Sequence, residues 1–457
     1  MSINSATNIL SQALDAFQTE LNTVGNNVSN VNTPGYTRET ANLSENEGTT
    51  GYGLGAYETG GGVSVSNITG IQNALLNQSL SSANSGNGLY QSLTSALSAA
   101  QSAFPEPSGS GVSAALSGFF NAFSSLASNP GSSSSQLAVQ QAAQTLTGAV
   151  QSAYGQLQQA SAQATAGIGQ SLSQINQLTG QIAGLNQQIA AQTAGGGSPN
   201  ALLDQRNTDV QTLSGLIDVQ TSTNANGTMN VYSNGLNLVD EGGATAMPSN
   251  YTAGVPTFTD GTTSVTIQGG ALAGGVLALG KLNSYTSQLN NIANSLTSEV
   301  NALYSTGKNG SGKTNQQFFV STNPPAGAAG FQVSAAILAS ASSIASGTSG
   351  KAGDGALAQS IAGLSTSQIT GLGSSTFGGY YDNLVGTVGA DVQNSTNSQS
   401  TQGALVKQVT AQQQSVSGVN LDEEMSNMLM YQQSYESAAK ALSVIDQTAE
   451  NLISVIQ

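Results

Sequence analysis

Carboxylates are the side chains of this sequence that could most readily do chemistry. Aspartate and glutamate together number 23, whereas histidine, cysteine and tryptophan are all absent. Two carboxylates can act as the acid and base of a glycoside hydrolase, but a chain with this many acids brings some pair together by chance. Without histidine or cysteine there is no Ser-His or Cys-His nucleophile pair and no ordinary zinc site. We therefore expect no enzymatic activity and no cofactor.

The densest acidic run consists of Asp422, Glu423 and Glu424, and it could bind calcium or begin a helix. A calcium loop alternates its acidic ligands around a glycine turn, and this run lacks that spacing. Asn420 precedes the run as a good N-cap residue, and Glu423 stands three positions later, as in a capping box. The negative charges also complement the positive end of a helix dipole. The run therefore predicts a helix cap rather than a metal site.

Basic residues are too few and too scattered to form a binding surface. The chain has 8 of them and a formal net charge of −15. Nucleic acid and anionic membrane surfaces would repel such a chain, so we expect no nucleic-acid partner. Arg206 stands between Asp204 and Asp209, a spacing typical of a structural ion pair rather than of a binding site.

Neither a targeting segment nor a membrane segment is evident. The first residues have no basic region followed by an apolar run, so we expect no cleaved signal peptide. No stretch of about 18 apolar residues occurs, so we expect no membrane insertion. Charged residues make up only 7% of the chain, against roughly 25% in globular proteins. A polar, weakly charged surface can lie against copies of itself without stripping many ions of water.

The elements that position these groups are clearest at the two ends of the chain. Residues 3–31 and 420–457 each carry apolar side chains that repeat every seven residues, which predicts helices with one apolar face. The N-terminal seam consists of Ile3, Leu10, Leu14, Phe17, Leu21, Val24, Val28 and Val31. The C-terminal seam consists of Leu421, Met428, Tyr431, Tyr435, Ala438, Leu442, Ile445, Leu452 and Ile456.

Each terminal helix must bury its seam, because an isolated helix of this length is marginal in water. The simplest solution pairs residues 3–31 with residues 420–457. The seams offer few opposite charges, so we expect side-chain shape to set the register. Several apolar residues lie off the C-terminal seam, which predicts that further chains cover them and that the ends become ordered on assembly. These residues are Met425, Leu429, Val444, Ile453 and Val455.

A turn ends the first helix. Its residues are Asn32, Thr33, Pro34, Gly35 and Tyr36. Pro34 drives Thr33 into an extended conformation and Gly35 readily adopts positive φ, so the sequence predicts a type II turn. Extended segments follow over 37–70. Further helices are expected over 71–103, 114–128, 135–194, 198–217, 275–306 and 381–416.

The predicted fold class is mainly α, with a small inserted β domain. We expect an elongated helical bundle in which the N- and C-terminal helices pair as a coiled coil. Segment 219–272 has β-like runs bounded by Asn-Gly and Asp-Gly turns. The chain then divides into a terminal assembly domain, an elongated helical domain and the β domain. Their residues are 1–35 with 416–457, 36–218 with 273–415, and 219–272.

Three motifs resemble the axial proteins of the bacterial flagellum. One is the turn from Asn32 to Tyr36 after an amphipathic helix. The second is the run from Ser417 to Glu424, and the third is Tyr431-Gln432-Gln433-Ser434-Tyr435 with the alanine-rich stretch that follows. The second motif, together with the run from Leu202 to Arg206, resembles the family of the first hook-associated protein, FlgK.

The resemblance implies a structural subunit of the hook–filament junction, extracellular at the distal end of the hook. It implies export through the flagellar type III export apparatus without a cleaved signal. The implied partners are the chain itself, the hook protein, a second hook-associated protein and the export chaperone FlgN on the C-terminal helix. Two alternatives remain: another axial subunit (hook, distal rod or second junction protein) and a secreted Ser/Gly-rich adhesin.

Overall fold

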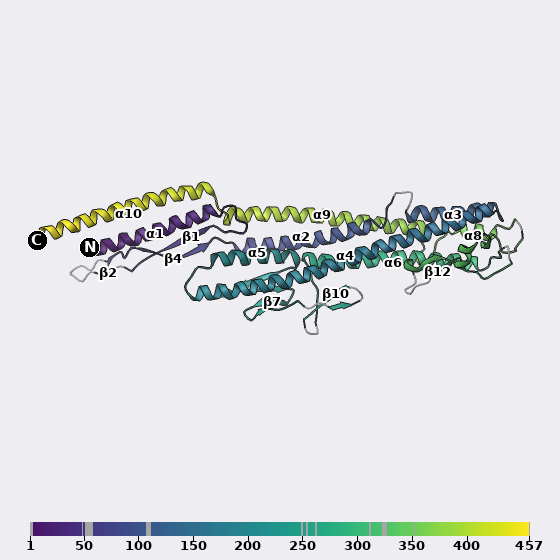
Figure 1. Ribbon diagram of the computed structural model, residues 1–457, viewed down its shortest axis with the longest axis horizontal. Helices are drawn as coiled ribbons and strands as arrows, with labels where there is room; N and C mark the ends of the chain where they lie inside the picture. Colours follow the sequence, from purple (N-terminus) through teal and green to yellow (C-terminus); the bar gives the residue numbers. More distant parts are fainter. Residues whose placement is uncertain are drawn as a thin grey trace.

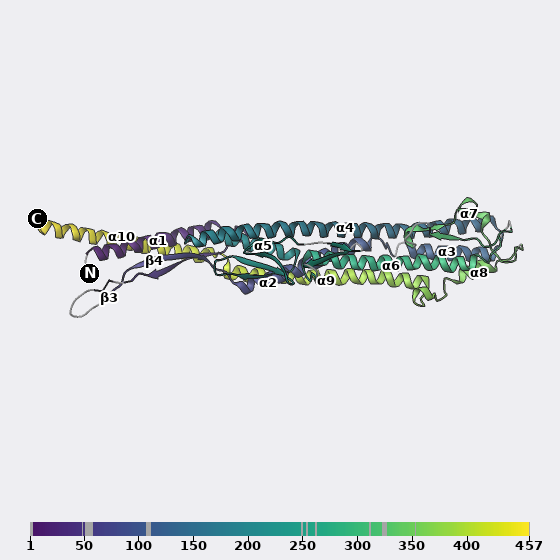
Figure 2. The ribbon, with the colours of Figure 1, turned by 90° about the horizontal axis from the view of Figure 1, so that it is seen from below.

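The computed structural model describes residues 3–47, 49–50, 58–106, 111–247, 250–252, 255–260, 263–309, 312–321, 327–351 and 353–456. The molecule is elongated, its long helices run along the long axis, and both termini lie at the same end (Figures 1 and 2). The helices are α1 (Ile3–Ser29), α2 (Ala74–Gln101), α3 (Val112–Ser128), α4 (Ser133–Ala194), α5 (Asn200–Leu216), α6 (Gly270–Tyr304), α7 (Ala335–Ala339), α8 (Ala356–Gly363), α9 (Phe377–Ser417) and α10 (Leu421–Ile456).

The strands form small antiparallel sheets beside these helices. β1 pairs with β4, β2 with β3 and β12 with β13, while β5-β6-β7-β8 and β9-β10-β11 form larger meanders. The strands are β1 (Glu39–Glu45), β2 (Thr49–Thr50), β3 (Glu58–Thr59), β4 (Val63–Gly70), β5 (Gln220–Thr223), β6 (Met229–Ser233), β7 (Leu236–Asp240), β8 (Gly243–Ala244), β9 (Asn250–Thr252), β10 (Val255–Asp260), β11 (Thr263–Val265), β12 (Phe319–Ser321) and β13 (Phe331–Val333).

Helix α4 is the longest element and spans most of the body. Its 62 residues reach about 93 Å at 1.5 Å each. It begins where the Ser132 hydroxyl accepts a hydrogen bond from the Ser135 N–H. Its isoleucines at heptad spacing, Ile168, Ile175, Ile182 and Ile189, are all buried. The helix therefore belongs to a bundle, in which it packs against α3, α5 and α6.

The body has two apolar cores. The one far from the termini is rich in aromatic rings from α3 and the segment after α6. Its fully buried phenylalanines are Phe119, Phe123, Phe318, Phe319, Phe331 and Phe377. The second core lies between α4, α5, α6 and the β5–β8 sheet, where Val231 and Val239 are fully buried. Each core closes within one chain.

The structure confirms the predicted fold class. The helices expected from the sequence are present, and their ends differ from the expected ones by a few residues, as helix boundaries commonly do. Strands β5 to β11 fall within residues 219–272. Helices α1 and α10 pack side by side at the terminal end (Figures 1 and 2). Within the described part of the chain, no helix is apolar and long enough to cross a membrane.

Candidate assembly site

The turn after α1 ties the terminal helices to the body. The Tyr36 N–H donates to the Thr33 carbonyl at 3.2 Å, and Gly35 has a φ of 81°, as a type II turn requires. Directly after the turn, the N–H and hydroxyl of Thr37 donate to the two carboxylate oxygens of Asp204 in α5, at 3.0 and 2.6 Å. Burial raises the pKa of Asp204, and the Thr37 hydrogen bonds oppose that rise. The turn is therefore held on α5 by a carboxylate.

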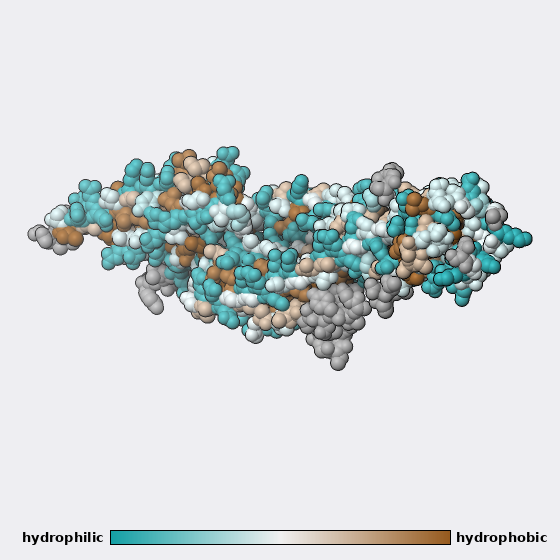
Figure 3. Space-filling model, turned by 45° about the vertical axis from the view of Figure 1, so that its right-hand side comes forward, coloured by the Kyte–Doolittle hydropathy of each residue, from teal (hydrophilic) through white to brown (hydrophobic). Residues whose placement is uncertain are grey.

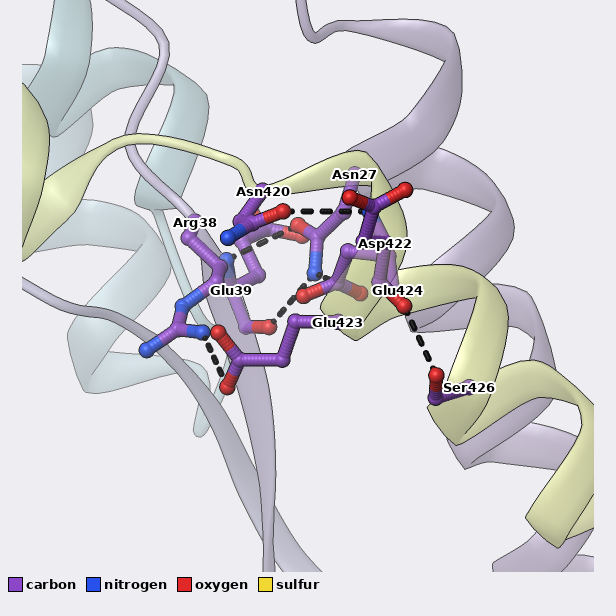
Figure 4. A network of polar contacts seen from close by, with 8 residues as sticks. All are labelled: Asn27, Arg38, Glu39, Asn420, Asp422, Glu423, Glu424 and Ser426. Carbon is purple, nitrogen blue, oxygen red and sulfur yellow. Dashed lines mark hydrogen bonds and ion pairs between the residues drawn. The ribbon is translucent and has the colours of Figure 1, made fainter.

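Asn27 lies at the centre of the junction between α1, β1 and α10 (Figure 4). Its amide N–H groups donate to the Glu39 carbonyl at 2.9 Å and to the Glu424 carboxylate at 3.1 Å. Its amide oxygen accepts from the Glu39 N–H at 2.9 Å and from the Tyr36 hydroxyl at 2.8 Å. The side chain is 1% exposed and uses all four of its hydrogen-bonding positions. Because both backbone groups of Glu39 are engaged, Asn27 takes the place of a neighbouring strand at the edge of β1.

The start of α10 is fixed by polar contacts on two sides. The Asn420 side chain accepts from the Asp422 N–H at 3.0 Å, as an N-cap does. Glu423 does not complete the expected capping box; its carboxylate lies 2.8 Å from the Arg38 guanidinium (Figure 4). The Arg38 N–H also donates to the Ser417 carbonyl at 2.8 Å. The segment after the first turn thus holds the end of α9 and the start of α10 together.

A second buried polar pair lies further along the terminal helices. Glu20 in α1 is 7% exposed, and its carboxylate accepts a hydrogen bond from the Tyr431 hydroxyl in α10. Burial raises the pKa of Glu20, and the hydrogen bond from Tyr431 partly offsets that effect. Burial is also the main cause that raises the pKa of Tyr431, so its hydroxyl stays protonated and can donate.

The two predicted seams face each other in the α1–α10 pair, but unequally. In the N-terminal seam, Val24 is buried and the other residues (Ile3, Leu10, Leu14, Phe17, Leu21, Val28 and Val31) are half-buried. In the C-terminal seam, Ala438 is buried, and Met428, Tyr431, Tyr435, Leu442 and Ile445 are half-buried. Leu421 and Leu452 are 46% and 49% exposed, and the side chain of Ile456 lies outside the described residues.

The expectation that side-chain shape sets the register did not include the polar contacts of the interface. The most buried groups of the interface include Glu20, Thr23, Asn27 and Glu424, and three of these four take part in the polar pairs described above. The sequence reasoning missed them because it followed apolar repeats only. A signal was present, since Glu20 and Asn27 stand one heptad apart on the face that packs inward. Hydrogen bonds require one geometry, so they define register more sharply than apolar contact does.

The expected ion pair between Arg206 and its neighbouring acids, Asp204 and Asp209, does not form among the described residues. Its guanidinium donates to the Asn186 side chain at 2.9 Å and to the Gly227 carbonyl at 2.7 Å, and it is 2% exposed. Burial lowers the pKa of Arg206 to about 10, so it remains a cation at neutral pH. Asp204 is directed to the turn at Thr37 instead. Arg206 therefore fastens the β5–β6 turn to α4 and α5, a structural role that neighbouring acids in the sequence did not predict.

Apolar side chains remain exposed on α10 outside its contact with α1. Leu421, Met425 and Leu429 recur every four residues along one stripe and are 46%, 47% and 58% exposed. Val444 and Ile453 are exposed as well, at 64% and 61%. The space-filling view shows hydrophobic surface among hydrophilic surface over the terminal helices (Figure 3). Such a surface on a helix at the end of an elongated molecule is typical of a protein contact.

Comparisons with protein families match three parts of the chain. Residues 97–319 match the family described as Flagellar hook-associated protein FlgK helical domain. Residues 8–37 match the family Flagella basal body rod protein, and residues 410–455 match Flagellar basal body rod FlgEFG protein C-terminal. The terminal sequences are thus common to several flagellar families, whereas the middle is particular to one.

Individual relatives agree over nearly the whole chain. The flagellar hook-associated protein 1 of Bacillus subtilis (strain 168) is 28% identical, with 97% of this chain and 96% of that protein covered. The protein of the same name from Salmonella typhimurium is 26% identical, with 99% of this chain and 100% of that protein covered. The solved structure of the flagellar hook junction protein FlgK from Burkholderia pseudomallei has the same fold at 18% identity, with a TM-score of 0.66. The structural match covers 74% of this chain and 100% of the Burkholderia pseudomallei chain.

The fold, the paired terminal helices and these matches define a bacterial flagellar axial protein, a class of structural proteins rather than enzymes. Its place is the bacterial flagellum. Within that class, the chain belongs to the family of flagellar hook-associated protein 1, FlgK.

Proposed function

We propose that this chain is a structural subunit of the hook–filament junction and assembles at the distal end of the hook through α1 and α10. The observation that carries the proposal is the contrast in burial along the molecule. The body closes its two cores within one chain, whereas α10 keeps Leu421, Met425 and Leu429 exposed. The names of the relatives, hook-associated protein 1 and hook junction protein, support the same position.

The division of the chain follows from this contrast. Residues 1–35 and 416–457 would form the assembly domain, residues 36–218 and 273–415 the helical body, and residues 219–272 a β domain on its side. The assembly domain would contact further copies of the chain, the hook protein and the second hook-associated protein. Before assembly, the export chaperone FlgN would cover the C-terminal helix. The chain would reach the cell exterior through the flagellar type III export apparatus without a cleaved signal.

Substitutions on the exposed stripe test the assembly role. Met425→Asp with Leu429→Asp places two charges on side chains that are about half exposed, so the single chain should still fold. In a strain that lacks the wild-type gene, we expect the variant to be secreted into the medium while hooks carry no filaments. Gln432→Asp with Gln433→Asp, on exposed polar positions of the same helix, is the matched control and should restore filaments. Normal filaments on the first variant would refute the proposal.

Substitutions in the C-terminal seam test the chaperone contact. Met428 and Leu442 are half-buried against α1. Replacing both with Asp should therefore weaken the binding of any partner that covers the same face of α10. We expect loss of FlgN binding in a pull-down and loss of incorporation at hooks. The deletion strain separates the alternatives: a hook protein leaves no hooks when deleted, whereas a junction protein leaves bare hooks.

A further inference from the structure

The two buried polar pairs between α1 and α10 belong to one register. Glu20 is bonded to Tyr431, and Asn27 is bonded to Glu424. Asn27 comes one heptad after Glu20 in α1, and Glu424 comes one heptad before Tyr431 in α10. In two antiparallel helices, a step of seven residues forward along one helix is matched by a step of seven residues back along the other, as in these two pairs. Both pairs can therefore form together in this alignment and in no alignment shifted by a heptad.

We propose that these two polar pairs are the specificity determinants of the terminal helices: α10 accepts a partner helix that offers a carboxylate and a carboxamide one heptad apart. The inference rests on the proposed function, since it concerns the helices that would assemble. Apolar heptads alone allow a slip of one heptad, because each seam residue then meets another apolar residue. The polar pairs give the different alignments different energies.

Each slip leaves a buried carboxylate without its donor. In one direction, Glu20 comes opposite Glu424, so two carboxylates of like charge face each other inside the interface. In the other direction, Glu20 comes opposite Ala438, whose methyl group cannot donate a hydrogen bond. A buried polar group without a partner loses its hydration and gains nothing in return. The observed alignment is the one that satisfies both carboxylates.

The orientation of Asn27 is fixed by groups outside α10. Its oxygen accepts from the Glu39 N–H and the Tyr36 hydroxyl, and one of its two amide hydrogens goes to the Glu39 carbonyl. The hydroxyl of Tyr36 in turn accepts from Asn26 at 3.3 Å, which favours its donating to Asn27. The remaining amide hydrogen of Asn27 points to α10 and requires an acceptor there. Glu424, 2% exposed, supplies that acceptor.

Engineered cysteines can report the alignment, because the chain contains no cysteine of its own. Ala13→Cys with Ala438→Cys reports the observed alignment, one heptad beyond the Glu20–Tyr431 pair. Ala6→Cys with Ala438→Cys reports the slip that opposes Glu20 and Glu424. Ala13→Cys with Ile445→Cys reports the opposite slip. The full-length purified chain is treated with a short thiol cross-linker, and the yield of intrachain product is measured for each pair.

We expect the first cysteine pair to cross-link at least about tenfold more than either other pair, as an unpaired buried polar group implies. In the triple variant Glu20→Leu, Tyr431→Phe, Glu424→Leu, the preference should fall below about threefold, because the polar groups that distinguish the three alignments are gone from α10 and Glu20 is gone from α1. Asn27 and its contacts to Glu39 are kept. Gln18→Leu with Gln432→Leu, exposed on the same helices, should keep the tenfold preference.

A milder variant keeps the test valid if the triple variant does not fold. Glu20→Gln with Glu424→Gln removes the like charges and keeps the side-chain shapes. The slip that opposes these two positions should then gain yield, while the opposite slip should not. A triple variant that keeps the tenfold preference, or a wild-type chain with no preference, would overturn the inference. Either result leaves the junction role standing, because that role is measured by filaments on hooks.

Discussion

At the end of the molecule far from the termini, the core is rich in buried aromatic rings. Phe119 alone has four other phenylalanine rings, from α3, β12 and the residue before β12, with ring centroids within 5.8 Å. In α1, apart from Val24, the buried side chains are small or polar, among them Ala16, Glu20 and Asn27. Apolar burial is strong but non-directional, whereas hydrogen bonds are weaker and geometric. One end is therefore packed by apolar burial, whereas the other is held by directional polar contacts.

The largest effect is expected from the aromatic core. Phe119→Ala should lower the free energy of unfolding by about 3–5 kcal/mol, because it leaves a cavity among rings that cannot close around it. Urea denaturation followed by circular dichroism measures the change. Leu405→Ala, at a position that is 40% exposed, is the control and should change the same quantity by less than about 0.5 kcal/mol. Equal effects at both positions would remove the contrast between core and surface.

A smaller effect is expected at the link between the two regions. Asp204→Ala removes the acceptor of both Thr37 groups and should cost about 1–3 kcal/mol, because the Thr37 N–H is left unpaired. Asp209→Ala is the matched control on the same helix. One buried oxygen of Asp209 has no hydrogen-bond partner among the described residues, so its loss should be neutral or stabilising. A larger loss at Asp209 than at Asp204 would contradict this account.

Acid should affect the two ends in opposite directions. Burial raises the pKa of Glu20 above its ordinary value near 4.5, so the folded pair binds this proton more tightly than the unfolded chain. The Glu20 contribution to stability therefore rises as pH falls through the raised pKa. At the far end, hydrogen bonds from the Ser349 side chain and from backbone N–H groups lower the pKa of Asp354 to about 2. That contribution is complete above the ordinary pKa near 3.8 and is lost as pH falls toward 2.

Melting curves between pH 7 and pH 4 provide the measurement for Glu20. Glu20→Gln should flatten the Glu20-dependent rise, whereas Asp354→Asn should leave that range unchanged, since the Asp354 effect falls at lower pH. A wild-type profile that matches the Glu20→Gln profile would show that burial of Glu20 does not disfavour its charge.

The smallest effects are expected along α4. Gly155, Gly169 and Gly180 are exposed, and a Cβ added at any of them would meet nothing within 4 Å. Gly→Ala at each site should therefore raise the free energy of unfolding by about 0.5–1 kcal/mol, because the helix loses less backbone entropy on folding. Gly88→Ala is the opposite case, since its Cβ would lie 2.0 Å from the Gly215 carbonyl oxygen. Stabilisation at Gly88 as well would show that the bundle packs more loosely than described.

Apolar periodicity was enough to predict most of the fold. It predicted every long helix and the pairing of the two ends, because burial of an apolar face dominates where a helix lies. Pro34 and Gly35 likewise predicted the turn after the first helix. The partners of polar side chains were not predicted, as Arg206 and Glu423 show. Each has polar residues close to it in the sequence that could be its partner. The partner that it actually contacts lies on a distant segment and is decided by how the segments pack.

Two chain segments connect the terminal helices to the body: the turn after α1 and the short break between α9 and α10. They run side by side, because the Arg38 N–H is bonded to the Ser417 carbonyl and the Arg38 guanidinium to Glu423. A single connection would let the terminal helices rotate about the long axis relative to the body. Two connections that are fastened to each other resist twisting about the long axis. Rotation of the terminal helices about the long axis is therefore coupled to rotation of the body.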